Sequence, residues 1–460
     1  MNSFLGRWFW LKSMAVGLMA FFVGPAHSSQ EKVQDKLLKL PHQEFRLKNG
    51  LRVFLVKFPS PGVVAYQLPV RVGSRNEVEK GKTGFAHFFE HLMFRGTKNR
   101  SGKEFGDLYT RLGAENNAWT DNDMTNYHGV VAKKYLPQIL EAEADRFRNL
   151  SFDEKLLKDE AGAVMGEYMK NISQPEAVLE EKLAEAAFKV HPYGHTTMGY
   201  REDIQKFSER YKDVWVFFER YYRPSNVSVV LVGDVDFAKS RQLIEKYFGK
   251  WKNPQTAQAL IASEPEQAEA RKVESRLGQK AQTRITVAYK IPGFSTRTPD
   301  IAAIELLSEM FFSKTSDFQN QFRFEKKWVD VVYTGRAEWI DPYVWTINLR
   351  LSALGEGKEA ELLTAIQTTV RGIASQQVSQ DRLGETKKRF RNAALSSWFK
   401  SPSDLADRIA WYSNLEPDQG IKALDAHFAQ LAKVTPAHIQ AVAKKHLVDS
   451  KMTTVILRGQ

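Results

Sequence analysis

The chain has 460 residues and a formal net charge of +12, and 43% of its residues are hydrophobic. This length and composition are typical of a globular protein with roughly two to four domains and large cores, and they exclude a disordered or fibrous chain. The sequence contains no cysteine, which excludes disulfides and thiolate catalysis, and no Lys/Arg-rich run with interleaved aromatic residues, so we expect no nucleic-acid partner.

The first 28 residues have the pattern of a secretory signal peptide. Arg7 and Lys12 precede an apolar run at 14–23, and small residues then lead to a cleavage position after Ser28. The run is short for a membrane-spanning helix, so we expect cleavage of residues 1–28, with an uncleaved anchor as the alternative. We therefore expect a periplasmic protein without a stable membrane span.

Residues 42–250 read as one unit that alternates between strand and helix patterns. In chain order they predict a hairpin at 45–56 turned at Asn49-Gly50, a strand at 63–72, a helix at 84–94, a strand region at 118–131, helices at 133–149, 153–171 and 209–222, and a strand at 226–232.

Residues 251–280 have weak periodicity, and we interpret them as a linker. Residues 281–460 then repeat the first pattern. They predict a strand at 286–292, a helix at 304–312, a strand at 344–351, helices at 357–375 and 379–398, a helix at 436–446 begun by Thr435 and Pro436, and a strand at 453–457. The simplest fold is α+β with two homologous domains, each a mostly antiparallel sheet with helices packed on one face.

The helix predicted at 84–94 contains the pattern His-x-x-Glu-His. His87 and His91 are four residues apart, so both imidazoles project from one helix face and can bind one zinc ion. Glu90 lies on the same face, within reach of a catalytic water. This order of residues occurs in a group of zinc peptidases. A plain polar stripe on a helix is the alternative.

A catalytic zinc held by two histidines needs a third protein ligand. On the helix predicted at 153–171, Glu160 and Glu167 are two turns apart and share a face. By spacing alone we interpret this face as a solvated acidic stripe, with a metal site as the alternative.

The second unit aligns Glu305, Ser308 and Glu309 with the three motif residues of the first. Because it lacks the histidines, we expect one metal site per chain, in the first domain only.

A rival histidine pair occurs at His191 and His195, also four residues apart. Pro192 and Gly194 lie between them and exclude a regular helical turn. We therefore interpret this segment as a structural loop and not as a metal site.

From Phe45 to Leu457 the chain resembles the pitrilysin/insulinase/mitochondrial-processing-peptidase family of zinc metallopeptidases. The pieces that carry the resemblance are, in order, Gly73-Ser74-Arg75, Gly84-x-Ala86-His87-x-x-Glu90-His91, Gly96-Thr97, Asn117-Ala118-x-Thr120, Thr125-x-Tyr127, Glu160 and Glu167, His191-Pro192-Tyr193-Gly194, Gly199-Tyr200-Arg201-Glu202-Asp203-Ile204, Tyr222-Arg223-Pro224-x-Asn226 and Gly233-Asp234.

The resemblance implies the family's metallohydrolase fold and one Zn²⁺ per chain. It implies that the zinc ligands are His87, His91 and Glu167, with Glu90 as general base. Glu160 matches the family's supporting acidic residue on the same helix. The residues Asn117, Ala118, Trp119 and Thr120 look like the family's edge strand, which binds a peptide substrate by strand addition.

The chain departs from the family at one place in the second domain. Active members carry an arginine and, seven residues later, a tyrosine that contact the substrate. Here Arg323 matches the arginine, but the seventh position is Asp330 and the nearest tyrosine is Tyr333. Either Tyr333 substitutes through a local shift, or a homologous partner subunit supplies the pair, as in relatives that divide the site between two chains. We favour the partner.

We therefore expect a zinc-dependent endopeptidase that hydrolyses peptides or unfolded polypeptide segments, as the zinc-bearing subunit of a heterodimer. Two non-catalytic functions on the same fold are the alternatives: an assembly or scaffold protein, or a protein that binds peptides without cutting them.

Overall fold

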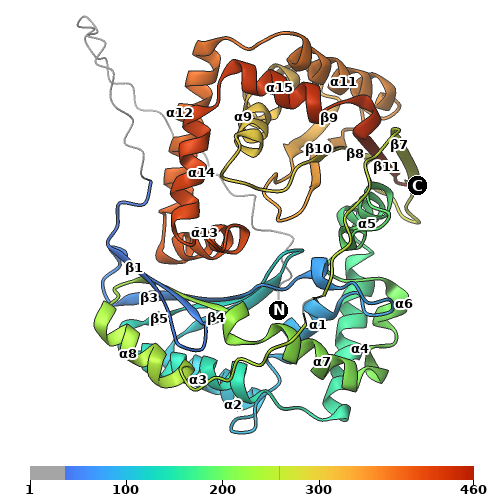
Figure 1. Ribbon diagram of the computed structural model, residues 1–460. Helices are drawn as coiled ribbons and strands as arrows, with labels where there is room; N and C mark the ends of the chain where they lie inside the picture. The colour runs from blue at the N-terminus through green and yellow to red at the C-terminus, as the bar shows by residue number, and fades with distance from the viewer. Residues whose placement is uncertain (1–36, 258) are drawn as a thin grey trace, which may run out of the picture.

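The computed structural model describes residues 37–257 and 259–460, so the predicted signal peptide at 1–28 lies outside the described residues. The two halves of the chain each form a sheet with helices, and the second half lies above the first in Figure 1. None of the helices in the described residues is long and apolar enough to cross a membrane.

The first half contains a six-stranded sheet in the order β1-β2-β6-β3-β5-β4. Its strands are β1 (His42–Arg46), β2 (Arg52–Lys57), β3 (Val63–Val70), β4 (Glu115–Thr120), β5 (Thr125–Ala132) and β6 (Ser228–Gly233). All neighbouring strands are antiparallel except β2 and β6. The predicted hairpin is confirmed, with Phe45 opposite Val53 and Gly50 at φ 95° in the turn.

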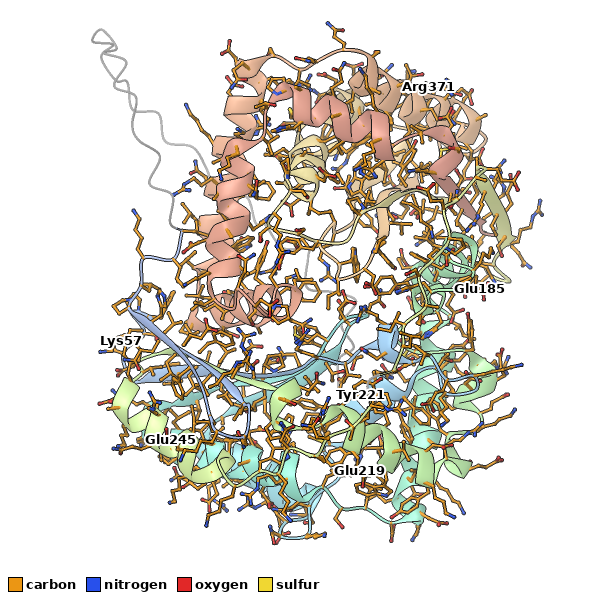
Figure 2. All side chains as sticks on the ribbon, in the orientation of Figure 1. Lys57, Glu185, Glu219, Tyr221, Glu245 and Arg371 are labelled. Atoms are coloured by element: carbon orange, nitrogen blue, oxygen red, sulfur yellow. The ribbon has the colours of Figure 1, made fainter. Side chains whose placement is uncertain are left out.

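Helices of the first half lie mainly on the face of this sheet that is lowest in Figure 1. They are α1 (Phe85–Leu92), α2 (Gly102–Leu112), α3 (Leu136–Asn149), α4 (Glu154–Asn171), α5 (Pro175–Ala187), α6 (Arg201–Ile204), α7 (Tyr211–Tyr221) and α8 (Phe237–Phe248). Because side chains alternate along a strand, Val53 and Leu55 of β2 belong to the core shared with these helices. Exposed acidic side chains such as Glu219 and Glu245 lie on the outer surface of the helices (Figure 2).

The second half contains a five-stranded sheet in the order β7-β11-β8-β10-β9. The strands are β7 (Arg271–Arg276), β8 (Arg284–Ile291), β9 (Val329–Thr334), β10 (Tyr343–Leu351) and β11 (Met452–Arg458). Again one neighbouring pair, β7 and β11, is parallel and the others are antiparallel. The predicted duplication is therefore visible in the sheets, because each half has a mostly antiparallel sheet with one parallel pair.

The helices of the second half include a long pair and several shorter ones. They are α9 (Asp300–Phe312), α10 (Asp317–Gln319), α11 (Glu359–Ser375), α12 (Gln380–Trp398), α13 (Pro402–Leu415), α14 (Lys422–Lys433) and α15 (Pro436–His446). α15 begins as predicted, because the Thr435 side chain accepts a hydrogen bond from the backbone N–H of His438 and Pro436 occupies the first turn.

The predicted linker at 251–280 is wrong in its last part, because β7 lies within it. Val273 is the one apolar residue of β7, whose side chains alternate between half-buried and exposed. Charged residues at this sheet edge conceal the strand pattern. Before β7, the Glu264 carboxylate accepts hydrogen bonds from the backbone N–H groups of Lys189, Val190 and His191, which fixes this segment on the first half.

Each half also covers the second face of the other half's sheet. α13 contacts β3 and β6 of the first sheet, and α5 contacts β11, β7 and β8 of the second. Phe54 and Val56, which point away from the first-half helices, share a core with Leu405 and Ile409 of α13. The sequence predicts helices on one face only. The exchange of α5 and α13 adds a covering layer to the other face and holds the two halves together.

Candidate metal centre

The histidine motif lies on α1, whose apolar side packs against aromatic rings. Phe88 stacks on Phe207 with ring centroids 4.6 Å apart, and Phe89 stacks on Phe217 at 5.3 Å. Phe85 is also almost fully buried in this core. The phenylalanines at these positions therefore fix the rotation of the helix, and the opposite face presents His87, Glu90 and His91.

A buried carboxylate holds the first turn of α1. Glu77 accepts hydrogen bonds from the backbone N–H groups of Gly84 at 2.6 Å and Ala86 at 2.7 Å. These N–H groups have no partner inside the helix, and a carboxylate at a helix N-terminus also interacts favourably with the helix dipole. Glu77 is only 6% exposed, and burial raises its pKa.

Close backbone packing explains two of the motif glycines beside this turn. Gly84 has φ 88°, and a Cβ atom there would lie 2.4 Å from the carbonyl oxygen of Met198. Gly199 has φ 79°, and its Cβ would lie 2.4 Å from the carbonyl carbon of Thr83. The segment around Gly199 therefore supports the start of α1 directly.

We expect Glu77→Ala to destabilise the protein by about 1–3 kcal/mol, because it leaves two buried N–H groups without their side-chain acceptor. Urea unfolding measures the loss, and zinc affinity is expected to fall with it. Glu79→Ala is the matched control. Its side chain is half-exposed and pairs with Lys82 and Arg220, so the cost is expected to stay below about 1 kcal/mol. Equal losses in both variants would contradict the role given to Glu77.

The structure brings the three predicted zinc ligands together, with one donor atom of each within 4.8 Å of the others. The Glu167 Oε2 atom lies 3.3 Å from His91 Nε2 and 3.9 Å from His87 Nε2. Two donors that are each about 2.0–2.1 Å from a tetrahedral zinc ion lie about 3.3–3.4 Å apart. The Glu167–His91 separation has this value and the Glu167–His87 separation is longer, so two imidazoles and one carboxylate converge on a position where a zinc ion would be held.

Glu160 orients His91 from the other side of its ring. The Glu160 Oε1 atom lies 2.8 Å from His91 Nδ1, and its other oxygen forms an ion pair with Arg95. A proton on Nδ1 shared with Glu160 leaves the Nε2 lone pair available to a metal. Burial disfavours the charged imidazolium, but hydrogen bonds with Glu160 and Glu167 raise the pKa of His91 to about 9. Burial and neighbouring His91 lower the pKa of His87 to about 4.

Glu90 lies beside this group and is held by the predicted substrate strand. Its Oε2 atom accepts a hydrogen bond from Thr120 Oγ1 at 2.7 Å. Burial raises the pKa of Glu90 to about 7. A carboxylate with this pKa can both accept and return a proton near neutral pH.

The other predicted substrate-binding residues of the first half lie on β4, the last strand of its sheet. β4 pairs with β5, where Asn117 is opposite His128 and Ala118 opposite Tyr127. Asn117 is exposed, and the Trp119 ring lies 6.5 Å from the ring of Trp411 on α13. β4 is an edge strand, the kind that accepts an added strand.

Arg323 and Tyr333 are not brought to the three ligands by any described contact. Arg323 lies in a π-helical turn (Asn320–Glu325), where its guanidinium donates to Gln319 Oε1 at 3.1 Å. Tyr333 lies on β9 opposite Asn348 and is 49% exposed.

The rival pair flanks a short 3-10 helix (Pro192–Gly194), where the sequence predicts a loop; no regular α-helical turn joins the two histidines, as Pro192 and Gly194 predict. His191 Nε2 lies 2.9 Å from Asp341 Oδ2, and its Nδ1 accepts the backbone N–H of Tyr193. His195 Nδ1 contacts the carbonyl oxygen of Thr196 at 2.9 Å.

The second half contains another group of possible donors, Glu305, Glu338 and His427. Here His427 Nε2 lies 2.9 Å from Glu305 Oε2, and Tyr412 donates a hydrogen bond to Glu338. A separation of 2.9 Å is that of a direct hydrogen bond, shorter than the spacing of two zinc ligands. We interpret this group as a buried hydrogen-bond network, with the pKa of Glu305 raised to about 7 by burial.

The sequence patterns do not indicate two features beside the candidate site: the contact of Glu77 with the first turn of α1, and the contacts of the turn at 121–124 after β4. In both cases a carboxylate binds backbone N–H groups, and no side-chain spacing signals such a contact. The only sign of the Glu77 contact in the sequence is an acidic residue seven positions before Gly84, which directly precedes α1.

Both halves of the chain match models of one protein family. Residues 52–201 match the model described as Insulinase (Peptidase family M16), and residues 209–390 match the model described as Peptidase M16 inactive domain.

The relatives include proteins with peptidase names. The chain is 29% identical to the zinc protease PqqE of Helicobacter pylori, across 91% of this chain and 93% of that protein. It is 29% identical to a probable mitochondrial-processing peptidase subunit beta of Schizosaccharomyces pombe, across 55% of each. A solved structure of a protease from Helicobacter pylori superposes with a TM-score of 0.83 at 28% identity, covering 91% of this chain and 99% of that one.

Proposed function

Because the chain belongs to peptidase family M16, we propose that it is a zinc-dependent endopeptidase of peptides or unfolded polypeptide segments. The observation that carries the proposal is the convergence of His87, His91 and Glu167 at zinc-ligand spacing, with Glu90 beside them. Relatives named as zinc proteases support the same chemistry.

In this proposal the residues of the site have separate tasks. A bound zinc ion would lower the pKa of a water molecule and polarise the scissile carbonyl group. Glu90 takes a proton from the attacking water and then gives it to the leaving amine. His87, His91 and Glu167 hold the metal, and Glu160 orients His91.

The peptide binds as an extra strand on β4. Backbone groups of Asn117, Ala118 and Trp119 give affinity, and alternate side chains give specificity. Thr120 at the end of the strand keeps the Glu90 carboxylate at the point where the added strand passes the metal.

A homologous partner subunit would complete the site. Arg323 and Tyr333 do not reproduce the family's pair, and the second half matches a model described as an inactive domain. A relative named as one subunit of a processing peptidase supports the division of work between two chains. The pattern of residues 1–28 supports export to the periplasm, where such a dimer would act.

The experiment is metal removal and return, with a fluorogenic unfolded peptide as substrate. Chelator treatment is expected to reduce hydrolysis to background, and one zinc per chain to restore it. The purified chain alone is expected to bind zinc but cleave slowly, because it lacks the arginine-tyrosine pair. Failure to bind zinc would contradict the proposal. Rapid cleavage by a verified monomer would contradict the need for a partner.

The family model of the second half favours one other function, a scaffold or peptide-binding protein that does not cleave. Such a protein would be indifferent to zinc and would return an added peptide intact after incubation with zinc and the partner. The same experiment therefore separates the two functions.

A further inference from the structure

The turn between β4 and β5, residues 121–124, packs tightly against the segment that leads into α1. A Cβ atom on Gly73 would lie 2.1 Å from the carbonyl oxygen of Asp121. The backbone N–H of Arg75 donates to the carbonyl oxygen of Asn122 at 2.9 Å. Ser74 Oγ donates to Asn122 Oδ1 at 2.8 Å. The end of the substrate strand and the approach to the metal helix therefore form one rigid unit.

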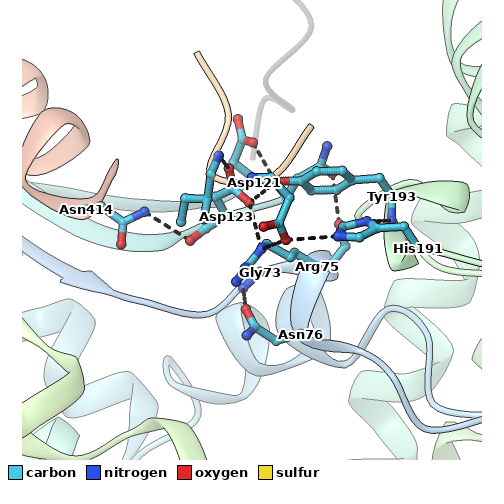
Figure 3. Close-up of polar contacts among 12 residues, drawn as sticks. Gly73, Arg75, Asn76, Asp121, Asp123, His191, Tyr193 and Asn414 are labelled. Carbon is cyan, nitrogen blue, oxygen red and sulfur yellow. Dashed lines mark hydrogen bonds and ion pairs between the residues drawn. The ribbon is translucent and has the colours of Figure 1, made fainter. Parts of the chain in front are cut away.

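The second half of the chain binds the same turn through Asp123 (Figure 3). The Asp123 carboxylate accepts the backbone N–H of Ile340 at 2.8 Å and the hydroxyl of Tyr193 at 2.6 Å. Its carbonyl oxygen accepts Asn414 Nδ2 from α13 at 3.1 Å. Asp123 as a whole residue is only 2% exposed, and it joins elements more than 200 residues apart.

Asp121, two residues earlier, adds an ion pair between the first and second halves of the chain. Its carboxylate accepts Arg336 Nη2 at 2.8 Å. The Arg336 guanidinium lies between the rings of Trp339 and Trp411, 4.2 Å and 3.9 Å from their centroids. Packed between two indoles, this guanidinium has little freedom to leave Asp121.

The Asp341 carboxylate closes the network from the second half. It lies 2.5 Å from Arg75 Nε and 2.9 Å from His191 Nε2, and both donors belong to the first half. Arg75 Nε is also 3.9 Å from Asp123, so its charge lies between two carboxylates (Figure 3). The loop at 336–341 thus contacts both the approach to α1 and the end of β4.

We propose that Asp123 is a positioning residue that fixes the end of β4 to the second half, so that an added peptide strand passes Glu90 in a productive register. The inference rests on the proposed peptidase function. β4 has a neighbour on one side only, and its free side receives the substrate, so its twist depends on how its ends are held. The second half, which lacks the histidine motif, therefore fixes the position of the substrate strand in the first half.

The test compares a long and a short peptide with Asp123→Asn. Asparagine has one acceptor oxygen in place of two, so it cannot accept from both Ile340 and Tyr193; the Tyr193 hydroxyl must turn from donor to acceptor, and the negative charge facing Arg75 is removed. We expect KM for a peptide that pairs with the whole of β4 to rise about tenfold, with zinc content unchanged. For a peptide too short to pair along β4 as far as Thr120, its last residue, kcat and KM are expected to stay near the wild-type values.

Two further variants keep the test independent of general destabilisation. Tyr193→Phe removes the hydroxyl donor but keeps the ring, and we expect the same selective rise in KM. Asp234→Asn is the matched control. Asp234 also accepts a backbone N–H group, that of Gly62, but lies at the other end of the first sheet, so neither peptide should respond. Equal effects of Asp123→Asn on both peptides would overturn the proposal.

A peptide-binding measurement distinguishes failure of this proposal from failure of the proposed peptidase function. In a Glu90→Gln background, affinity for the long peptide is read by fluorescence anisotropy, without hydrolysis. Asp123→Asn is expected to weaken it about tenfold, even if the chain proves not to be a peptidase. Unchanged affinity would overturn the positioning role, whereas absent hydrolysis by the zinc-loaded wild-type chain together with its partner subunit would overturn only the catalytic function.

Discussion

Glu90→Gln is expected to lower kcat/KM for peptide hydrolysis by about 10²–10⁴-fold, while the chain keeps its zinc. Glutamine has nearly the same shape and can still accept the hydrogen bond from Thr120, but it cannot take a proton from water. The loss should appear in kcat, because the carboxylate acts on the attacking water. Progress curves with a fluorogenic peptide and metal analysis of the same sample measure both quantities.

Glu219→Gln is the control for this substitution. Glu219 is an exposed glutamate on α7, on the outer surface of the first half, and its change should leave kcat/KM and zinc content at their wild-type values (Figure 2). If Glu90→Gln retains wild-type kcat, another group is the general base, and the catalytic task assigned to Glu90 is wrong.

The second large effect is expected from Glu167, the proposed zinc ligand on α4. Glu167→Ala leaves two histidines, too few to hold a zinc ion firmly. Glu160→Gln keeps all three ligands but weakens the orientation of His91, so zinc affinity is expected to fall about 10–100-fold. Glu167→Ala is expected to lose more than that. Competition with a chromophoric chelator measures both affinities.

The order of these two losses is the decisive outcome. A greater loss from Glu160→Gln than from Glu167→Ala would mean that Glu160 is the ligand and Glu167 an acidic surface residue. Wild-type zinc affinity in both variants would mean that neither glutamate of α4 takes part in zinc binding.

The sequence predicts most of the metal centre because it lies on two helices with readable spacing. Four residues place His87 and His91 on one face of α1, and seven place Glu160 and Glu167 on one face of α4. Spacing alone leaves open which glutamate faces the histidines, and the family resemblance selects Glu167. The structure supports that assignment through the 3.3 Å separation of Glu167 Oε2 from His91 Nε2.

Contacts between distant segments are the part that the sequence leaves undetermined. α13 is not among the helices predicted from the sequence, and no pattern in its residues indicates that it covers the sheet of the other half. In the sequence, Asp123 looks like any aspartate in a turn. Its role depends on a hydrogen bond from the backbone N–H of Ile340, more than 200 positions later, which no local pattern indicates. β7 could not be predicted because it is an edge strand made mostly of charged residues, so its sequence lacks the alternation of apolar and polar residues that indicates a strand.

Anomalous diffraction at the zinc absorption edge, from crystals of the zinc-loaded chain, tests the central claim most directly. The account predicts one peak per chain, within bonding distance of His87 Nε2, His91 Nε2 and a Glu167 carboxylate oxygen. Absence of a peak there, or a peak between Glu305, Glu338 and His427 instead, would contradict it.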